Sequence, residues 1–316
     1  MTIAWVFPGQ GSQVVGMGRD VYAAFPAARD VFEEADATLK LPLTRLCFEG
    51  PEAELTATEN VQPALLTVST ALLRAMESAA GRPLPLPRAV AGHSLGEYAA
   101  LVAGGALSFA EALRLVRRRG ELMAEAGAGG MAAVLGLDVE TLEQVCRETN
   151  EALAEDPASI SSVVVANYNA PDQLVISGAT RAVEHAGRLA KQRGARRVVP
   201  LKVSAAFHSP LMRQAAEGMA RAIEAATIQP LRTPLIANVT AEPLVAPGEV
   251  RRELVAQVVA PVRWIASVQR MARDGVTTFL EIGPGKVLSG LIRRIAPQAQ
   301  ALSIGSAAEV REVRVE

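Results

Sequence analysis

The chain has few cysteines and almost no net charge. Cys47 and Cys146 are the two cysteines among 316 residues, which excludes a disulfide framework, and neither lies in a CxxC or Cys/His pattern typical of zinc. We therefore expect a reducing, cytoplasmic location. The formal charge of −1 provides no overall field that would attract nucleic acid or an anionic membrane surface.

Long hydrophobic runs are also missing. The longest apolar run, residues 98–110, is interrupted by glycine and serine and is too short to span a bilayer as a helix. The start, MTIAWVFPGQ, has no basic segment and is not expected to be a signal peptide. Half of the residues are apolar, so the chain can bury a large core in one domain with an insertion, or in two domains.

Apolar strands alternate with helices in most of the chain. We predict strands at 3–7, 88–92 and 277–283, and helical stretches that include 60–80, 97–125 and 211–226. This alternation predicts an α/β domain with a parallel sheet, whose functional loops follow the carboxyl ends of the strands.

Residues 130–203 have a different order of elements. The pattern predicts strand, helix, two strands, helix and strand, which is the order of a ferredoxin-like unit. The GAGG segment at 127–130 is typical of a hinge-like linker. We expect a discontinuous large α/β domain, 1–129 and 204–316, with a ferredoxin-like small domain, 130–203, inserted into it.

The segment AGHSLGEYAA contains the G-x-S-x-G pattern between a predicted strand and a predicted helix. In that context the pattern indicates a nucleophilic serine, Ser94, on a tight turn, with the Leu95 amide facing a developing oxyanion. The alternative is a glycine-rich turn with an N-cap serine.

A serine nucleophile needs a base, and the chain has three histidines. His93 adjoins the serine but is expected to point elsewhere, and His185 lies in a helix of the small domain. His208 lies where a strand ends and a loop turns toward a helix, so elimination selects it. Taken alone, it would be interpreted as a core or capping histidine.

The loop FPGQGSQVVGMG does not fit a phosphate-binding motif. Val14 stands where a dinucleotide fingerprint needs glycine, and Met17 stands where a P-loop needs lysine. The loop follows a strand and presents the amide of Gln10, which suits a second oxyanion donor. An ordinary glycine turn is the alternative.

Three consecutive arginines, residues 117–119, lie in an amphipathic helical pattern. At about 100° per residue, Arg119 falls within the apolar stripe, whereas Arg114, Arg117 and Arg118 fall on the solvent side or its flank. A buried guanidinium needs a partner. A structural carboxylate or a substrate carboxylate would serve, because the planar fork binds either one bidentately.

Seven segments together resemble the malonyl-CoA:acyl carrier protein transacylases and the related acyltransferase domains of polyketide synthases. These segments are FPGQGSQ, GHSLGEYAAL, RRRGELMAEA, NYNAPDQLVISG, VSAAFHSPLM, PVRW and EIGPGKVLSGL. The resemblance implies a hydrolase-like large domain with a ferredoxin-like insertion. It also implies acyl carrier protein and a coenzyme A thioester as partners, with no metal and no cofactor.

The resemblance also implies roles for individual residues. Ser94 would carry the malonyl ester, with His208 as general base and then acid. Gln10 and Leu95 would form the oxyanion hole, and Arg119 would bind the malonyl carboxylate.

Two further residues would complete the substrate site. The backbone carbonyl of Gln257 would orient the histidine in place of a triad acid. The Phe207 ring would disfavour an α-methyl branch, with a modest effect because one methylene is worth about 1–3 kcal/mol.

We expect malonyl transfer for fatty-acid synthesis by a monomer. A stand-alone acyltransferase for a polyketide synthase is the alternative. A serine esterase or thioesterase would normally have a triad acid and would not explain Arg119, and a non-catalytic binding module is a further alternative.

The polar segment 150–162 is expected to be a surface loop that could alter carrier docking. Arg196 and Arg197 are candidate carrier contacts, although a solvated charge pair is the simpler interpretation.

Overall fold

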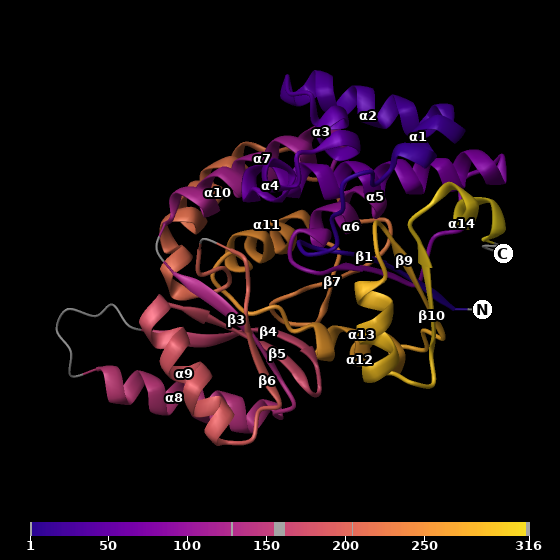
Figure 1. The fold of residues 1–316 in the computed structure, drawn as a ribbon. Coiled ribbons are helices and arrows are strands. Elements are labelled where there is room, and N and C mark those ends of the chain that lie inside the picture. Colours follow the sequence, from indigo (N-terminus) through magenta and orange to yellow (C-terminus); the bar gives the residue numbers. More distant parts are fainter. Residues whose placement is uncertain (1, 128, 155–161, 204, 314–316) are drawn as a thin grey trace.

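A computed structural model of the chain describes residues 2–127, 129–154, 162–203 and 205–313. A six-stranded sheet, the large sheet, has the strand order β10-β9-β1-β2-β7-β8 (Figure 1). Its strands are parallel except for β8, which pairs antiparallel with β7. They are Ile3–Phe7 (β1), Ala89–Gly92 (β2), Leu235–Ile236 (β7), Pro243–Leu244 (β8), Thr278–Ile282 (β9) and Gln300–Ile304 (β10).

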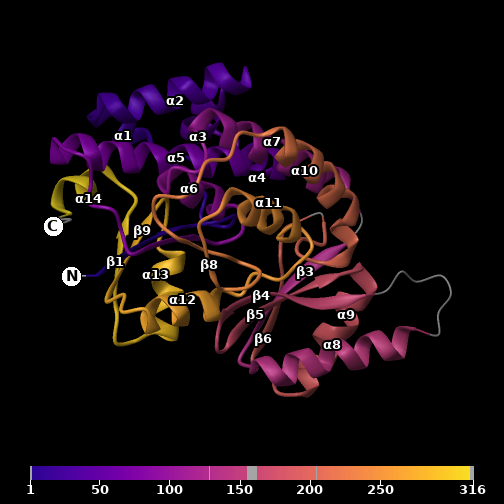
Figure 2. The same cartoon turned by 180° about the vertical axis from the view of Figure 1, so that it is seen from behind.

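Helices cover both faces of the large sheet, as Figures 1 and 2 show from opposite sides. Because side chains alternate along a strand, Trp5 and Phe7 belong to the core under α5 and α6, and Ala4 and Val6 to the core under α12 and α13. The helices are Arg19–Ala24 (α1), Pro26–Leu39 (α2), Leu43–Glu49 (α3), Glu52–Thr56 (α4), Thr58–Ala80 (α5), Gly96–Ala103 (α6), Phe109–Glu125 (α7), Arg213–Ala225 (α10), Pro247–Ala256 (α11), Trp264–Arg273 (α12), Val287–Ile295 (α13) and Ala307–Glu312 (α14), with a 3₁₀ turn at Pro210–Met212.

The helical stretch predicted over 97–125 is not continuous, because the structure has two helices there, α6 and α7. Gly105 adopts φ +81° after α6, a conformation that ends a right-handed helix. Ser108 then begins α7 by accepting a hydrogen bond from the Glu111 amide through its side chain. The three predicted strands correspond to β1, β2 and β9.

A separate antiparallel sheet, the small sheet, has the order β4-β5-β3-β6. Its elements follow the predicted ferredoxin-like order: Gly130–Leu135 (β3), Val139–Leu153 (α8), Val163–Ala170 (β4), Gln173–Gly178 (β5), Thr180–Gln192 (α9) and Arg197–Pro200 (β6). The mixed α/β fold class is thus confirmed, and the domain boundaries at 129/130 and 203/204 stay a prediction. Most of the predicted surface loop, residues 155–161, lies outside the described residues.

The small sheet contacts the large α/β part through its edge strand β4. The Tyr168 amide donates to the Val262 carbonyl at 2.9 Å, and the Val262 amide donates to the Ala166 carbonyl at 2.9 Å. The loops after β1, β2 and β7 lie at the carboxyl edge of the large sheet, where parallel α/β sheets place their sites. Among the described residues, no helix is long and apolar enough to cross a membrane.

Candidate active site

Ser94 lies on a tight turn between β2 and α6 and has φ +51°. Neighbouring glycines are required because the backbone folds back on itself. A Cβ on Gly92 would lie 1.9 Å from the carbonyl carbon of Gly96, and a Cβ on Gly96 would lie 2.1 Å from the Phe7 oxygen. The G-x-S-x-G pattern therefore has a steric reason, and the left-handed serine is typical of a functional turn.

His208 contacts the serine directly. Its Nε2 lies 2.7 Å from Ser94 Oγ, and its Nδ1 lies 2.8 Å from the Gln257 carbonyl oxygen and 3.1 Å from that of Ala260. A carbonyl oxygen only accepts, so Nδ1 carries the proton and donates it, which leaves Nε2 to accept the Ser94 hydroxyl proton. The imidazole is thus held by backbone carbonyls where a triad would have a carboxylate.

The imidazole is also kept neutral. Burial, and then the nearby Arg119 cation, lower the pKa of His208 from 6.5 to about 3. The side chain is buried, with 3% of its surface exposed. His208 is consequently unprotonated at neutral pH, as a general base must be.

Two backbone amides, those of Leu95 and Gln10, are the predicted oxyanion donors. Leu95 is the N-cap residue of α6, so its amide is among those for which a helix supplies no acceptor. The loop after β1 passes very close to the serine turn, since a Cβ on Gly9 would lie 2.4 Å from the His93 oxygen. Gln10 follows directly on that loop, so the structure brings the Gln10 segment close to the serine turn, and its role as an oxyanion donor stays a prediction.

Arg119 on α7 is buried, with 1% of its surface exposed. Its guanidinium donates to Gln62 Oε1 at 2.9 Å, to Gln257 Oε1 at 2.9 Å and to Ser94 Oγ at 3.1 Å. Its Nε has no hydrogen-bond partner. Within the described ranges it forms no ion pair, so neutral oxygens satisfy part of the guanidinium and no carboxylate binds it directly.

Burial does not neutralise this arginine. It lowers the pKa of Arg119, and the neighbouring Tyr98 and Glu97 oppose that change. An arginine in a protein stays protonated. A desolvated cation therefore lies 3.1 Å from Ser94 Oγ and favours a negatively charged ligand there.

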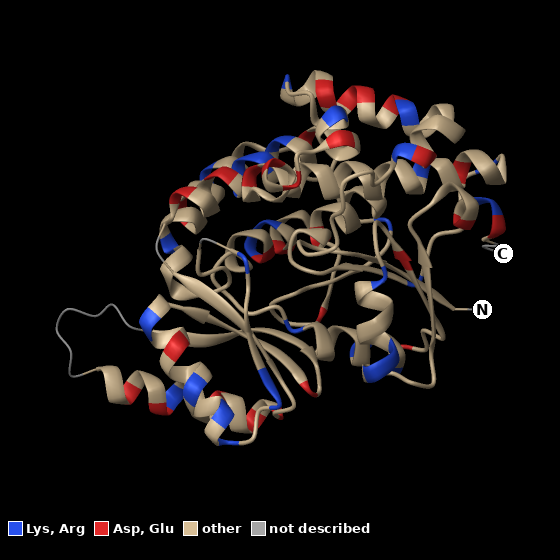
Figure 3. Ribbon diagram, viewed as in Figure 1, with Lys and Arg blue, Asp and Glu red and all other residues tan. Residues whose placement is uncertain are grey.

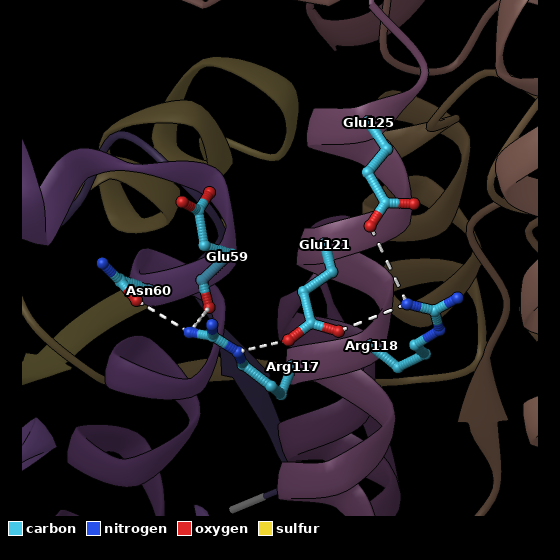
Figure 4. Close-up of polar contacts among 6 residues, drawn as sticks. All are labelled: Glu59, Asn60, Arg117, Arg118, Glu121 and Glu125. Carbon is cyan, nitrogen blue, oxygen red and sulfur yellow. Dashed lines mark hydrogen bonds and ion pairs between the residues drawn. The ribbon is translucent and has the colours of Figure 1, made fainter. Parts of the chain in front are cut away.

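The other arginines of the run differ from one another (Figure 4). Arg118 is half exposed and faces Glu121 at 3.4 Å, as predicted for a solvated side chain. The prediction of a solvated side chain is wrong for Arg117, which is 24% exposed. It donates to Glu121 at 2.8 Å, to the Glu59 carbonyl at 3.1 Å and to Asn60 at 2.8 Å, because α7 packs on the first turn of α5.

The remaining histidines have other contacts. His93 Nε2 lies 2.7 Å from Asn169 Oδ1 on β4, and its ring packs near Trp264. His185 on α9 contacts Thr149 of α8 at 3.3 Å. Both contacts agree with the elimination that selected His208.

Two residues that the sequence interpretation did not single out also contact the serine turn. Asn238 after β7 accepts from the Ser94 amide at 2.7 Å, and Glu97 on α6 accepts from both the amide and the side chain of Asn238 at 2.9 Å. A polar residue directly after a buried strand could have indicated Asn238. An acid in the first helical turn after the serine could have indicated Glu97.

A cavity of about 610 Å³, large enough for part of a small ligand, opens beside the loop after β1 that carries Gln10. Its lining includes Gln10, Thr58, Glu59, Lys202 and Val203, so it runs between α5 and the segment that leaves the small sheet. The Phe207 ring next to His208 is buried, with 6% exposed.

Residues 4–310 match the family model described as the acyl transferase domain, so the chain belongs to that family. A malonyl CoA-acyl carrier protein transacylase of Bacillus subtilis is 46% identical over 305 residues, covering 96% of this chain and 93% of that protein. An acyl-carrier-protein S-malonyltransferase structure from Bartonella henselae has a TM-score of 0.91 at 44% identity and covers 98% of this chain and 97% of its own.

A third relative was solved with its partner. It is a malonyl-transacylase in complex with the holo acyl carrier protein of a type II polyketide synthase, with a TM-score of 0.92 at 40% identity and 98% of each chain covered. The resemblance inferred from the sequence motifs is thereby confirmed, as is the mixed α/β fold.

Proposed function

We propose that this protein transfers the malonyl group of malonyl-CoA to the phosphopantetheine thiol of acyl carrier protein for fatty-acid synthesis. The relatives' names support the reaction. The observation that carries the choice of acyl group is the buried Arg119, which contacts Ser94 Oγ at 3.1 Å and forms no ion pair within the described part of the chain. The free carboxylate of a malonyl group would be the anionic partner that Arg119 lacks, and a guanidinium can bind a carboxylate with two parallel hydrogen bonds.

In the first half-reaction His208 Nε2 takes the proton of Ser94 as the Oγ attacks the thioester carbonyl. The amides of Leu95 and Gln10 stabilise the oxyanion. The tetrahedral intermediate expels the coenzyme A thiolate, which receives the proton from His208. The products are a seryl malonyl ester and free coenzyme A.

The second half-reaction reverses these roles. The phosphopantetheine thiol gives its proton to His208, and its sulfur attacks the seryl ester. Ser94 leaves and recovers a proton from His208, which yields the malonyl thioester of the carrier protein. The carbonyls of Gln257 and Ala260 hold the imidazole throughout, so this cycle requires no triad acid, metal or cofactor of its own.

The cavity that Gln10 and Lys202 line suits the pantetheine arm, which both thioesters share. Lys and Arg positions on α9 and at the start of β6, blue in the ribbon of Figure 3, outnumber the acidic position on α9 and suit an acidic carrier surface. Arg197 is exposed there, whereas Arg196 pairs with Asp172 at 2.9 Å and is partly engaged. Phe207 beside the histidine disfavours a branched acyl group.

A polyketide pathway is the second candidate, since one similar structure holds a polyketide carrier protein. Transfer rates to fatty-acid and polyketide carrier proteins distinguish the two pathways.

We further propose that the protein is a monomer in the cytoplasm. Cys47 and Cys146 are both free and buried, and burial raises the pKa of each thiol to about 12, so neither thiol is reactive.

The covalent step has a direct test. Malonyl-CoA alone should leave a malonyl mass increment on Ser94, seen by intact-mass and peptide mass spectrometry, and holo carrier protein should remove it. The Ser94→Ala variant is the control and should stay unmodified. Hydrolysis that outpaces transfer to the carrier would instead favour a thioesterase, and an unmodified wild-type serine would refute the ester route.

A further inference from the structure

A buried carboxylate lies beneath the serine–histidine pair. Glu97 occupies the first turn of α6, three positions after Ser94, and has no exposed surface. Its Oε1 accepts from the Asn238 amide and from Asn238 Nδ2, both at 2.9 Å, and its Oε2 accepts from Gln257 Nε2 at 2.6 Å. Burying a carboxylate is costly, and this one is surrounded by donors from two amide side chains.

The first amide side chain leads to the nucleophile. Asn238 Oδ1 accepts from the Ser94 amide at 2.7 Å, and Asn238 Nδ2 also donates to the Gly92 carbonyl at 2.7 Å. Asn238 therefore bridges the Gly92 carbonyl and the Ser94 amide, the part of the turn that leads into Ser94, and so holds the left-handed serine in place.

The second amide side chain leads to the other two functional groups. Gln257 Nε2 also donates to the Ser94 carbonyl at 2.9 Å, and Gln257 Oε1 accepts from Arg119 at 2.9 Å. The backbone carbonyl of the same residue accepts from His208 Nδ1. One glutamine thus contacts the serine turn, the arginine and the histidine.

An amide side chain has a donor end and an acceptor end and works only in one orientation. If the Gln257 amide were reversed, its NH₂ group would face the Arg119 donors and its oxygen would face the Ser94 carbonyl. If the Asn238 amide were reversed, its NH₂ group would face the Ser94 amide. Glu97 accepts at both of its oxygens, so it selects the same orientation of each amide as the Ser94 backbone and Arg119 do. Burial and the neighbouring Glu253 raise the pKa of Glu97, whereas the N–H donors on its oxygens favour the charged form.

We propose that Glu97 is a positioning residue that orients Asn238 and Gln257 and so holds Ser94, His208 and Arg119 in one reactive arrangement. The proposal rests on the proposed acyl transfer at Ser94. In a triad, a carboxylate would contact the histidine directly. Here His208 contacts Gln257, and Gln257 contacts the carboxyl group of Glu97.

Glu253 on α11 offers a matched control. It is also buried, with 6% exposed, and it accepts from the Val239 amide at 2.9 Å, next to Asn238. It holds the same loop through the backbone and contacts neither amide side chain. A buried carboxyl that served stability alone would behave alike at both positions.

The experiment compares Glu97→Gln, Glu97→Asp and Glu253→Gln with the wild type. E97Q keeps the shape but places a donor among donors, so we expect kcat to fall about 100-fold for malonyl and acetyl transfer alike, as a displaced catalytic group would produce. E97D keeps an acceptor-only group and should retain more activity than E97Q. E253Q should keep the wild-type kcat, and the KM for acetyl-CoA should not change in any variant.

Labelling of Ser94 by diisopropyl fluorophosphate separates this proposal from the proposed function, because that reagent forms a phosphoester with loss of fluoride and carries no carboxylate. Slower labelling of E97Q than of E253Q supports the positioning role even if wild type forms no malonyl ester. Equal labelling, or E97Q as active as E97D, overturns it. If E97Q does not fold, E97D decides: labelling slower than E253Q supports the role, and equal labelling contradicts it.

Discussion

The guanidinium of Arg119 is a desolvated cation whose described hydrogen-bond partners are uncharged oxygens. Arg119→Ala removes the charge-assisted hydrogen bonds that a malonyl carboxylate would accept, each worth about 1.5–3 kcal/mol. We expect kcat/KM for malonyl transfer to fall about 100-fold or more. Acetyl transfer, which presents no carboxylate, should persist or rise. Parallel assays with malonyl-CoA and acetyl-CoA check this.

Arg118→Ala is the control from the same helix, since that side chain is half exposed and faces Glu121. It should leave both acyl transfers at wild-type rates. An equal loss of malonyl and acetyl transfer in the Arg119 variant would contradict binding of the malonyl carboxylate. Arg119 would then serve only to hold Ser94 and His208 in position.

His208 links stability to pH. Its pKa falls from 6.5 in the unfolded chain to about 3 in the fold. Between these values the unfolded chain binds a proton that the folded protein does not, so stability is complete above pH 6.5 and is lost as the pH falls through that window. The free energy of unfolding should fall by about 1.4 kcal/mol for each pH unit below 6.5 because of this histidine.

Urea unfolding of wild type and His208→Gln at pH 7.5 and 5.5 measures that contribution. On going from pH 7.5 to 5.5, wild type should lose about 1 kcal/mol more of its free energy of unfolding than the variant does. A difference that does not depend on pH would show that the imidazole is not held neutral by burial.

Among the elements, the contact of α7 with α5 sets the position of the arginine. A Cβ on Gly120 would lie 2.6 Å from the Glu59 Cα and 2.7 Å from the Thr58 oxygen. Gln62, which binds Arg119, lies one turn further along α5. Gly120→Ala must therefore separate the helices, and we expect a loss of about 1–3 kcal/mol in the free energy of unfolding.

The same variant should weaken malonyl transfer more than acetyl transfer, because the arginine and its glutamine move apart. Gly290→Ala on α13 is the matched control: a Cβ there meets no atom within 4 Å, and alanine is favoured in a helix by about 1 kcal/mol. Thermal unfolding measures the stability of each variant, and the two acyl-transfer assays measure the ratio of malonyl to acetyl transfer. A Gly120 variant as stable as wild type would contradict the close packing of α7 on α5.

On the scale of the whole molecule, the site lies where the large sheet meets the small one. A carrier protein has to approach this junction, so charge on β6 and α9 should affect the second half-reaction alone. Arg197→Glu should raise the KM for carrier protein several-fold, a typical effect for a rim charge, and leave the rate of Ser94 malonylation unchanged. Arg82→Glu, exposed on the loop before β2, is the control and should change neither.

Added salt should reduce the difference between wild type and the Arg197 variant, because exposed charges are screened. Slower malonylation by malonyl-CoA in that variant would show that the residue acts on the site itself. An unchanged KM for the carrier would move the docking surface elsewhere.

The sequence by itself determined the motifs and most of the regular elements. Glycines around Ser94, an arginine within an apolar helical stripe and a strand–helix alternation are local patterns with local physical causes. They predicted the serine turn, the burial of Arg119 and the order of strands and helices along the segment that forms the small sheet. The break at Gly105 was missed, because the apolar pattern continues across it.

Only the tertiary structure decided which polar groups meet. Glu97, Asn238 and Gln257 come from α6, the loop after β7 and the end of α11, and no spacing in the sequence relates them. Arg117 was misplaced for the same reason, since two of its three partners, Glu59 and Asn60, lie on another helix. Hydrogen bonds over such separations depend on how helices and strands pack, and the packing arises from the whole core rather than from any one segment.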